Sequence, residues 1–241
     1  MTPHNWYPYG LFVHTLTPKI IRKLKLTDTP QANADTQRVL SALTGLHRAY
    51  PLERRIKNEA CDDTRETYLA VLLRWLQTGT APLTDGFDRE SLDELAALDA
   101  IFIVNGQIGC PPFNVVKTDI QVHFPHETLH VLSALDALAL PRMLNTAATV
   151  ETRCAMSGQP INFSLTQEGK LLQEESGAAV VAFQKVANNI TRYTFDLAPG
   201  IRFVLPEHAR TLQQTLTLDE ASAVANTFYS FQRKLLKDIA L

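Results

Sequence analysis

Apolar residues in the first hundred positions recur at intervals of three or four, which is the period of an amphipathic helix. The pattern predicts four helices, at 17–26, 39–46, 68–76 and 88–98. Gly79 and Asp88 support the last two, because glycine commonly follows a helix and aspartate commonly caps one. A hairpin is predicted at 101–109 (IFIVNGQIG), where Asn-Gly is typical of a two-residue turn.

Helices followed by a hairpin are typical of a winged-helix module, for which DNA binding is the obvious function. Here the last helix before the hairpin (FDRESLDELAALD, 87–99) carries five acidic residues and one arginine. A recognition helix needs the opposite charge to approach phosphates. The whole chain has a formal net charge of −2, so its composition gives no bias towards nucleic acid. We therefore expect no nucleic-acid partner.

Beyond Pro141 the pattern changes to short strands and one final helix. The final helix begins near Asp219, and Thr217 with Glu220 fits a capping box. The predicted fold class is α+β: an N-terminal helical, winged-helix-like part is followed by a small mixed or antiparallel sheet that a C-terminal helix covers. The predicted strands lie in AATVETRCA and INFSLTQ, which flank the turn SGQP, and in GAAVVAFQKV and IRFVLP.

Three segments are expected: a helical extension at 1–62, the winged-helix-like part at 63–126 and a core domain at 127–241. Charge is uneven along the first two. Residues 19–57 carry nine Lys/Arg and three Asp/Glu, whereas residues 59–99 carry ten acids and three bases. Such blocks usually mark solvated helix faces. The alternative is a basic surface that holds an acidic partner.

Composition favours a cytoplasmic, reduced protein. There is no run of 18 apolar residues, so we expect no membrane partner. The start, MTPHNWYPYGLFVHTL, lacks the basic region, apolar region and small-residue cleavage site of a secretory signal. Cys61, Cys110 and Cys154 are far apart and make neither a metal-ligand pair nor a disulfide framework. We expect no bound metal and no cofactor.

A hydroxyl and a carboxylate stand in an otherwise apolar segment, LHVLSALDALALP at 129–141. If a strand ends there and a helix begins, Ser133 is the N-cap and Asp136 the third helical residue, close to a capping box. Such a cap is worth about 1 kcal/mol. The alternative is a catalytic pair, which the spacing does not exclude.

An ordered set of motifs runs from the hairpin to the strands beyond this segment. A wing of the form G-x-I-x-x-x-P-F is followed by a threonine and a strand, by the helix start ALDAL and by a Cys-x-x-x-Gly turn. In this order the motifs resemble the alkylmercury (organomercurial) lyase family. The resemblance extends roughly from Tyr68 to the C-terminal helix, and the matching residues are Gly106, Ile108, Pro112, Phe113, Thr118, Ala134–Leu138, Cys154, Ser157 and Gly158.

The resemblance implies the family fold but not the family reaction. The family breaks a carbon–mercury bond with two cysteine thiolates, which suit soft Hg(II), and an aspartate that carries the proton. Asp136 matches that aspartate, but Ser133 stands where the first cysteine belongs, and no cysteine follows Cys154. Cys154 matches a buried, non-catalytic cysteine and Cys110 lies in the wing, so both are expected to be small core residues.

Two functions remain in competition, besides a regulatory or structural role. In the first, the lyase cleft binds a small organic molecule or a peptide, and the protein assists enzymes of a natural-product or peptide-modification pathway. Ser133 and Asp136 would line that cleft, with Arg142 and Arg153 as anion partners.

In the second, the protein is an enzyme of different chemistry. Asp136 would be a general acid or base, with Ser133 as its partner and His123 or His130 nearby in sequence. Burial in an apolar segment would raise the pKa of Asp136, which suits proton transfer.

Overall fold

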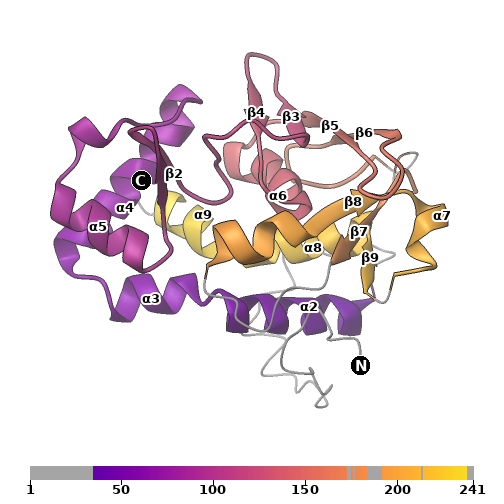
Figure 1. The fold of residues 1–241 in the computed structure, drawn as a ribbon, viewed down its shortest axis with the longest axis horizontal. Coiled ribbons are helices and arrows are strands. Elements are labelled where there is room, and N and C mark those ends of the chain that lie inside the picture. The colour runs from indigo at the N-terminus through magenta and orange to yellow at the C-terminus, as the bar shows by residue number, and fades with distance from the viewer. Residues whose placement is uncertain (1–34, 173–174, 176, 184–191, 213, 238–241) are drawn as a thin grey trace.

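The computed structural model describes residues 35–172, 175, 177–183, 192–212 and 214–237 (Figure 1). The helix predicted at 17–26 lies outside these residues. The described residues begin with four helices and a hairpin, continue into a mainly stranded region, and end with two helices beneath it (Figure 1). The first four helices are α2 (Thr36–Ala49), α3 (Leu52–Asn58), α4 (Asp62–Thr78) and α5 (Arg89–Ala97).

The first described helix, α2, is part of the core of the molecule. It begins at the cap Asp35, whose carboxylate accepts from the Gln37 amide at 2.9 Å. Its predicted apolar face is confirmed, because Val39, Leu40, Leu43 and Leu46 are buried. This face packs against α8 (Leu218–Phe228), and the buried side chains of residues 39–231 form one cluster. The proposed segment boundaries at 62 and 126 stay predictions.

The predicted Asn-Gly hairpin is confirmed. Strands β1 (Phe102–Val104) and β2 (Gln107–Gly109) pair antiparallel, and both turn residues have positive φ, 51° at Asn105 and 76° at Gly106. This is the left-handed backbone that a tight two-residue turn requires. The Trp75 indole of α4 donates to the Ile108 carbonyl at 3.0 Å and holds the hairpin against the helices. The winged-helix assignment itself stays a prediction.

Among the described residues, the stranded region contains two antiparallel sheets, where the sequence predicted one small sheet. The four predicted strands are confirmed, and so is the α+β class. The strand expected before Ser133 is present as β4 (Thr128–His130), and β3 (Gln121–His123) lies after Thr118, where the resemblance implies a strand. Strand β9 (Thr215–Thr217) was not predicted, since three residues are too few to show alternation. A bond from the Ala155 amide to the Phe203 carbonyl, 3.0 Å, links the two sheets. The strand order of the four-stranded sheet is β4 (Thr128–His130), β3 (Gln121–His123), β5 (Ala148–Arg153) and β6 (Pro160–Leu165). The strand order of the three-stranded sheet is β8 (Ile201–Val204), β7 (Val180–Phe183) and β9 (Thr215–Thr217).

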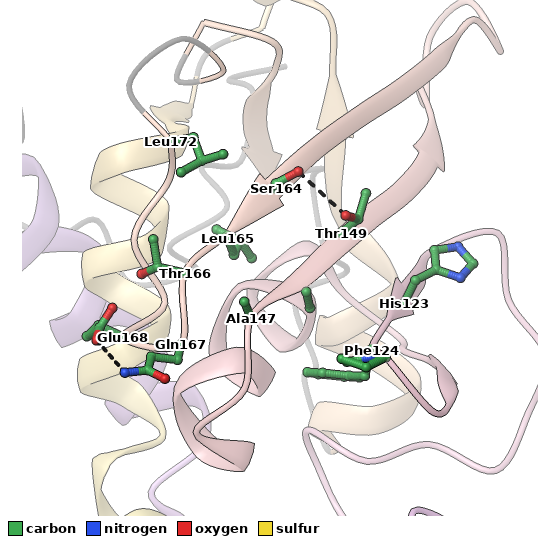
Figure 2. A pocket seen from close by; sticks show the side chains of 12 residues that line it. His123, Phe124, Ala147, Thr149, Ser164, Leu165, Thr166, Gln167, Glu168 and Leu172 are labelled. Atoms are coloured by element: carbon green, nitrogen blue, oxygen red, sulfur yellow. Dashed lines mark hydrogen bonds between the residues drawn. The ribbon is translucent and has the colours of Figure 1, made fainter.

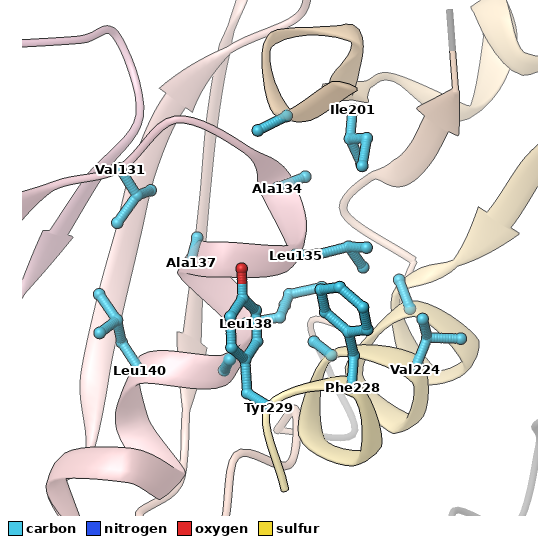
Figure 3. Close-up of a cluster of buried hydrophobic side chains, with 14 of the residues drawn as sticks. Val131, Ala134, Leu135, Ala137, Leu138, Leu140, Ile201, Val224, Phe228 and Tyr229 are labelled. Carbon is cyan, nitrogen blue, oxygen red and sulfur yellow. The ribbon is translucent and has the colours of Figure 1, made fainter. Parts of the chain in front are cut away.

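Helix α6 (Ala134–Leu144) lies between the sheets and α8, and nearly all its side chains are buried. Figure 3 shows its apolar residues, among them Leu135 and Leu138, against Val224 and Phe228 of α8. A helix that is apolar on every side is typical of the centre of a core. The only other α-helix of the stranded region, among described residues, is the single turn α7 (Pro206–Ala209).

The capping box predicted at Thr217 and Glu220 is confirmed, but the single long final helix is wrong. Two helices replace it, α8 and α9 (Ser230–Lys237), because the backbone leaves the helical region at Tyr229 (φ −86°, ψ 13°). Near its start, α8 is tied to α2 by an ion pair between Arg38 and the buried Glu220 (Nη1–Oε1 3.3 Å). Among the described helices, none combines the length and apolar character needed to cross a membrane.

Candidate functional site

Ser133 and Asp136 form the capping box that the sequence predicted. The Asp136 amide donates to Ser133 Oγ at 3.1 Å, and the Ser133 amide donates to Asp136 Oδ2 at 3.0 Å. Both side chains are sealed from solvent, with exposed fractions of 0% and 1%. The structural role of the pair is therefore shown directly by its geometry.

The second oxygen of Asp136 binds two tyrosines that sequence analysis missed. Oδ1 accepts hydrogen bonds from the hydroxyl of Tyr193, at 3.0 Å, and from that of Tyr229. The two hydroxyl oxygens lie 2.9 Å apart, and Ser133 Oγ is 3.5 Å from the Tyr193 hydroxyl. Figure 3 shows the Tyr229 hydroxyl directed towards the turn of α6 that carries Leu135 and Ala137. Both tyrosines are buried, so this is a closed polar cluster inside the core.

Burial raises the pKa of Asp136 to about 6, although hydrogen bonds from Tyr229, Ser133 and Tyr193 oppose that rise by stabilising the carboxylate. Burial, and then the nearby Asp136 charge, raise the pKa of Tyr193 and of Tyr229 well above the ordinary value. The phenols therefore stay neutral and donate to the carboxylate. The cluster could hold or release one proton near pH 6, on Asp136.

Tyr193 is held at its other end by a second buried carboxylate, Asp99. The Tyr193 amide donates to Asp99 Oδ2 at 2.5 Å, and the ring stacks on Tyr50 with centroids 4.6 Å apart. The Tyr50 hydroxyl donates to the Asp99 carbonyl at 2.8 Å. Asp99 follows α5 with a left-handed backbone (φ 58°), and burial raises its pKa to about 6. These contacts fix the helical turn Tyr193–Leu197 over the start of α6.

The other predicted site residues lie elsewhere. Arg142 is in the last turn of α6, about 13 Å along the helix from Ser133 at 1.5 Å per residue. Arg153 is exposed at the end of β5 and donates to the Gly158 carbonyl at 3.1 Å. His130 Nδ1 lies 2.9 Å from the carbonyl of Thr118.

His123 also lies away from the cluster, with Nδ1 3.0 Å from Thr128 Oγ1 and Nε2 3.2 Å from a carboxylate oxygen of Glu151. Of the residues singled out from the sequence, the structure thus brings together only Ser133 and Asp136.

The cysteines do not approach one another in a metal site. Cys61 is exposed at the start of α4, while Cys110 and Cys154 are buried, as expected for core residues. Burial raises the pKa of Cys110 to about 12. Burial works in the same direction at Cys154, but hydrogen bonds from the Ser157 hydroxyl and the Leu205 amide lower its pKa overall. Across the described residues, no three His, Cys, Asp or Glu side chains are grouped to hold a metal ion.

An open groove lies on the outer face of the four-stranded sheet, away from Ser133 and Asp136 (Figure 2). Its volume is about 690 Å³. The start of β5, Ala147–Thr149, makes the floor. The walls are the turn His123–Pro125 on one side and, on the other, Ser164–Glu168 with Leu172. A volume in this range fits a small organic ligand.

Nothing in the local sequence around Tyr193 marks it as a partner of Asp136. Tyr229 had a weak signal: it interrupts the apolar face of the final helix with a phenol, and a buried tyrosine normally finds a partner for its hydroxyl. The groove also had no signal, since its walls come from three separate parts of the chain.

The fold is of the α+β class, with the Ser-x-x-Asp capping box at the start of its central helix α6. Residues 113–194 match the family model described as alkylmercury lyase. Among solved structures, the mercury-bound form of MerB2 is similar in fold, with a TM-score of 0.59 and 18% identity over 76% of this chain and 98% of that chain. None of the curated proteins matches. The resemblance inferred from the motifs is therefore confirmed by the family model over residues 113–194 and, for the fold, by the structural similarity.

Proposed function

We propose that this protein binds an organic molecule or a peptide and does not cleave carbon–mercury bonds. One observation carries the proposal. Asp136, which matches the proton-carrying aspartate of the resembled family, is only 1% exposed, and its carboxylate is hydrogen-bonded to Ser133, Tyr193 and Tyr229. A proton donor must reach the leaving carbon. In this arrangement the Asp136 carboxylate contacts only Ser133, Tyr193 and Tyr229 and is closed to a substrate.

The ligands for mercury are also missing. Ser133 offers a hard, un-ionised hydroxyl where the resemblance calls for a soft thiolate. That hydroxyl is engaged as the cap of α6, accepting from the Asp136 amide at 3.1 Å. Cys110 has a pKa of about 12, so it carries no thiolate at neutral pH. No cysteine follows Cys154 in the chain, so the second thiolate that the resemblance places in the last third of the chain is absent.

A second candidate is catalysis of another kind by Asp136. Its pKa of about 6 and its two phenol partners are the specific observation in favour, since a general acid or base works best near the ambient pH. A substrate could reach Asp136 only if Tyr193 or Tyr229 moved away. Replacement of Asp136 by Asn would then abolish turnover while leaving ligand affinity unchanged.

Binding is tested on the full chain by thermal denaturation in the presence of a panel of organic amines, organic acids, neutral aromatics and short peptides. A ligand that binds only the folded state raises the melting temperature. We expect at least one class to do so in a concentration-dependent way. A flat response to every class would contradict the binding function. An accessory role beside pathway enzymes is part of the proposal, and a ligand class would indicate which chemistry those enzymes perform.

A further inference from the structure

The geometry points to the groove between β3, β5 and β6 as the ligand site, and to a small organic amine with an apolar body as its ligand. This inference rests on the proposed binding function and names its site and substrate class. The buried Ser133–Asp136 cluster offers no surface to a ligand, whereas the groove is open and about 690 Å³ in volume.

The groove is preformed by contacts on its far wall. The loop after β6 closes tightly, with the Gly169 amide donating to the Thr166 carbonyl at 2.8 Å. The Gly169 carbonyl accepts from Ser222 Oγ and from Asn226 Nδ2 of α8, the latter at 3.2 Å. Gly169 has φ 70°, and a side chain there would collide with Asn226. The wall is therefore anchored to the core, which lowers the cost of ordering it on binding.

Both walls present apolar surface to the same space. Phe124 and Pro125 lie on one side, Leu172, which is 48% exposed, lies on the other, and Ala147 forms the floor between them. Figure 2 shows Phe124 and Leu172 on opposite sides of the sheet surface that carries Ala147. These residues suit an aromatic or aliphatic body rather than a fully polar ligand.

The polar groups of the groove favour a cation. Among the described residues that line it there is no lysine or arginine, and one, Glu168, is acidic. Hydrogen bonds from the Thr166 hydroxyl and from the Gln167 amide, at 3.0 Å, lower the pKa of Glu168, so its carboxylate is ionised at neutral pH. Lys170 is exposed on the same turn but does not line the groove.

Other polar and aromatic groups of the groove would also stabilise a bound ammonium group. The hydroxyl oxygens of Thr149, on the floor, and Ser164, on the wall, lie 3.5 Å apart and can accept hydrogen bonds from the ammonium group. The Phe124 ring adds a face that attracts cations.

The same wall disfavours an extended peptide added to the edge of β6. The Ser164 amide donates to Glu175 Oε2 at 2.6 Å, and the Ser164 carbonyl accepts from the Leu172 amide at 3.5 Å. Backbone groups that an added strand would need are thus already paired at this end of β6. Pro160 at the other end lacks an N–H.

The test compares three probes of similar shape on the full chain at pH 7: 2-phenylethylamine, 2-phenylethanol and 3-phenylpropionate. Binding is followed by backbone amide shifts in NMR titrations. We expect the amine to shift amides at 123–124, 147–149 and 164–168, and to bind at least about threefold more tightly than the alcohol, as for a single solvent-exposed ion pair. The carboxylate should bind more weakly than either.

Two variants separate charge from shape. Glu168→Gln should remove most of the amine's advantage over the alcohol, while Glu207→Gln, an exposed site on α7, should leave it unchanged. Ala147→Trp fills the floor of the groove and should lower the affinity for the amine by at least about tenfold. Ala155→Trp, in the exposed turn after β5, should leave that affinity unchanged. Melting temperatures of all four variants check that the fold is intact.

The inference is overturned if the carboxylate binds as tightly as the amine, if the shifts lie outside the groove, if Ala147→Trp binds normally, or if about 10 mM amine produces no shift. Should another class in the panel stabilise the protein while the amine fails here, only this inference is lost. Turnover of an organomercurial would instead remove the proposed function, whatever the amine does.

Discussion

Asp136 is a carboxylate with one partner close by in sequence, Ser133, and two from distant parts of the chain, Tyr193 and Tyr229. A buried charge costs stability unless it is hydrogen-bonded, and here both oxygens are satisfied. Local sequence could predict the Ser133 partner, because capping boxes have a fixed spacing. It could not predict the tyrosines, since their approach depends on how α6, α8 and the 193–197 turn pack together.

Replacing Ser133 by alanine should lower the free energy of unfolding by about 1 kcal/mol, because the cap of α6 is lost. Chemical denaturation with urea measures this directly. Ser157→Ala, in the exposed turn after β5, is the control; it removes a hydrogen bond to the Cys154 thiol but no helix cap, and should lower the free energy of unfolding by less. An unchanged free energy of unfolding in Ser133→Ala would mean that the hydrogen bond from the Asp136 amide to Ser133 Oγ, 3.1 Å, contributes nothing to stability.

Asp136 should make stability depend on pH. Its pKa is raised from 3.8 to about 6 in the folded protein, so the folded state binds the proton more tightly than the unfolded state does. Lowering the pH from 6 towards 4 therefore stabilises the fold, and raising it through 6 removes that contribution.

The wild-type protein should consequently gain about 2 kcal/mol relative to Asp136→Asn between pH 7 and pH 4. Denaturation of both at several pH values gives this difference. Asp93→Asn, at an exposed position on α5, serves as the control and should run parallel to the wild type. Parallel curves for Asp136→Asn as well would show that Asp136 titrates alike in the folded and unfolded states.

Helices were easier to predict than strands in this chain. Residues 39–46 repeat their apolar face over several turns, whereas β3 and β9 have three residues each, too short for a pattern. The final helix was predicted as continuous because its apolar spacing continues through Phe228 and Phe231. Its break at Tyr229 depends on tertiary contact, which propensity does not encode.

Helix α2 should be energetically part of the core, although the sequence places it in an extension. Leu43 is fully buried, and its replacement by alanine should cost about 2–5 kcal/mol in one cooperative transition. Leu83→Ala, at a residue 58% exposed, is the control and should cost little. If α2 were an independent appendage, Leu43→Ala would leave the main unfolding transition where it is.

For the molecule as a whole, the motifs were enough to predict the fold. The family-model match over residues 113–194 and the structural similarity to MerB2 confirm that prediction. The proposed binding site was not predictable in the same way. The cleft expected beside Ser133 has become a sealed core, while the groove is assembled from the β3–β4 turn, the start of β5 and the loop after β6. Surfaces formed by separate segments leave no local pattern in the sequence.

We propose that this protein, although its fold is similar to that of MerB2, does not cleave carbon–mercury bonds. The most direct measurement is benzene release from a phenylmercury salt in excess thiol, with the full-length protein, with Ser133→Cys and with no protein. We expect both proteins to match the thiol-only control, because Asp136 is sealed by Tyr193 and Tyr229 and a second thiolate is absent even when Ser133 becomes cysteine. Benzene above that control from the unmodified protein would contradict the account.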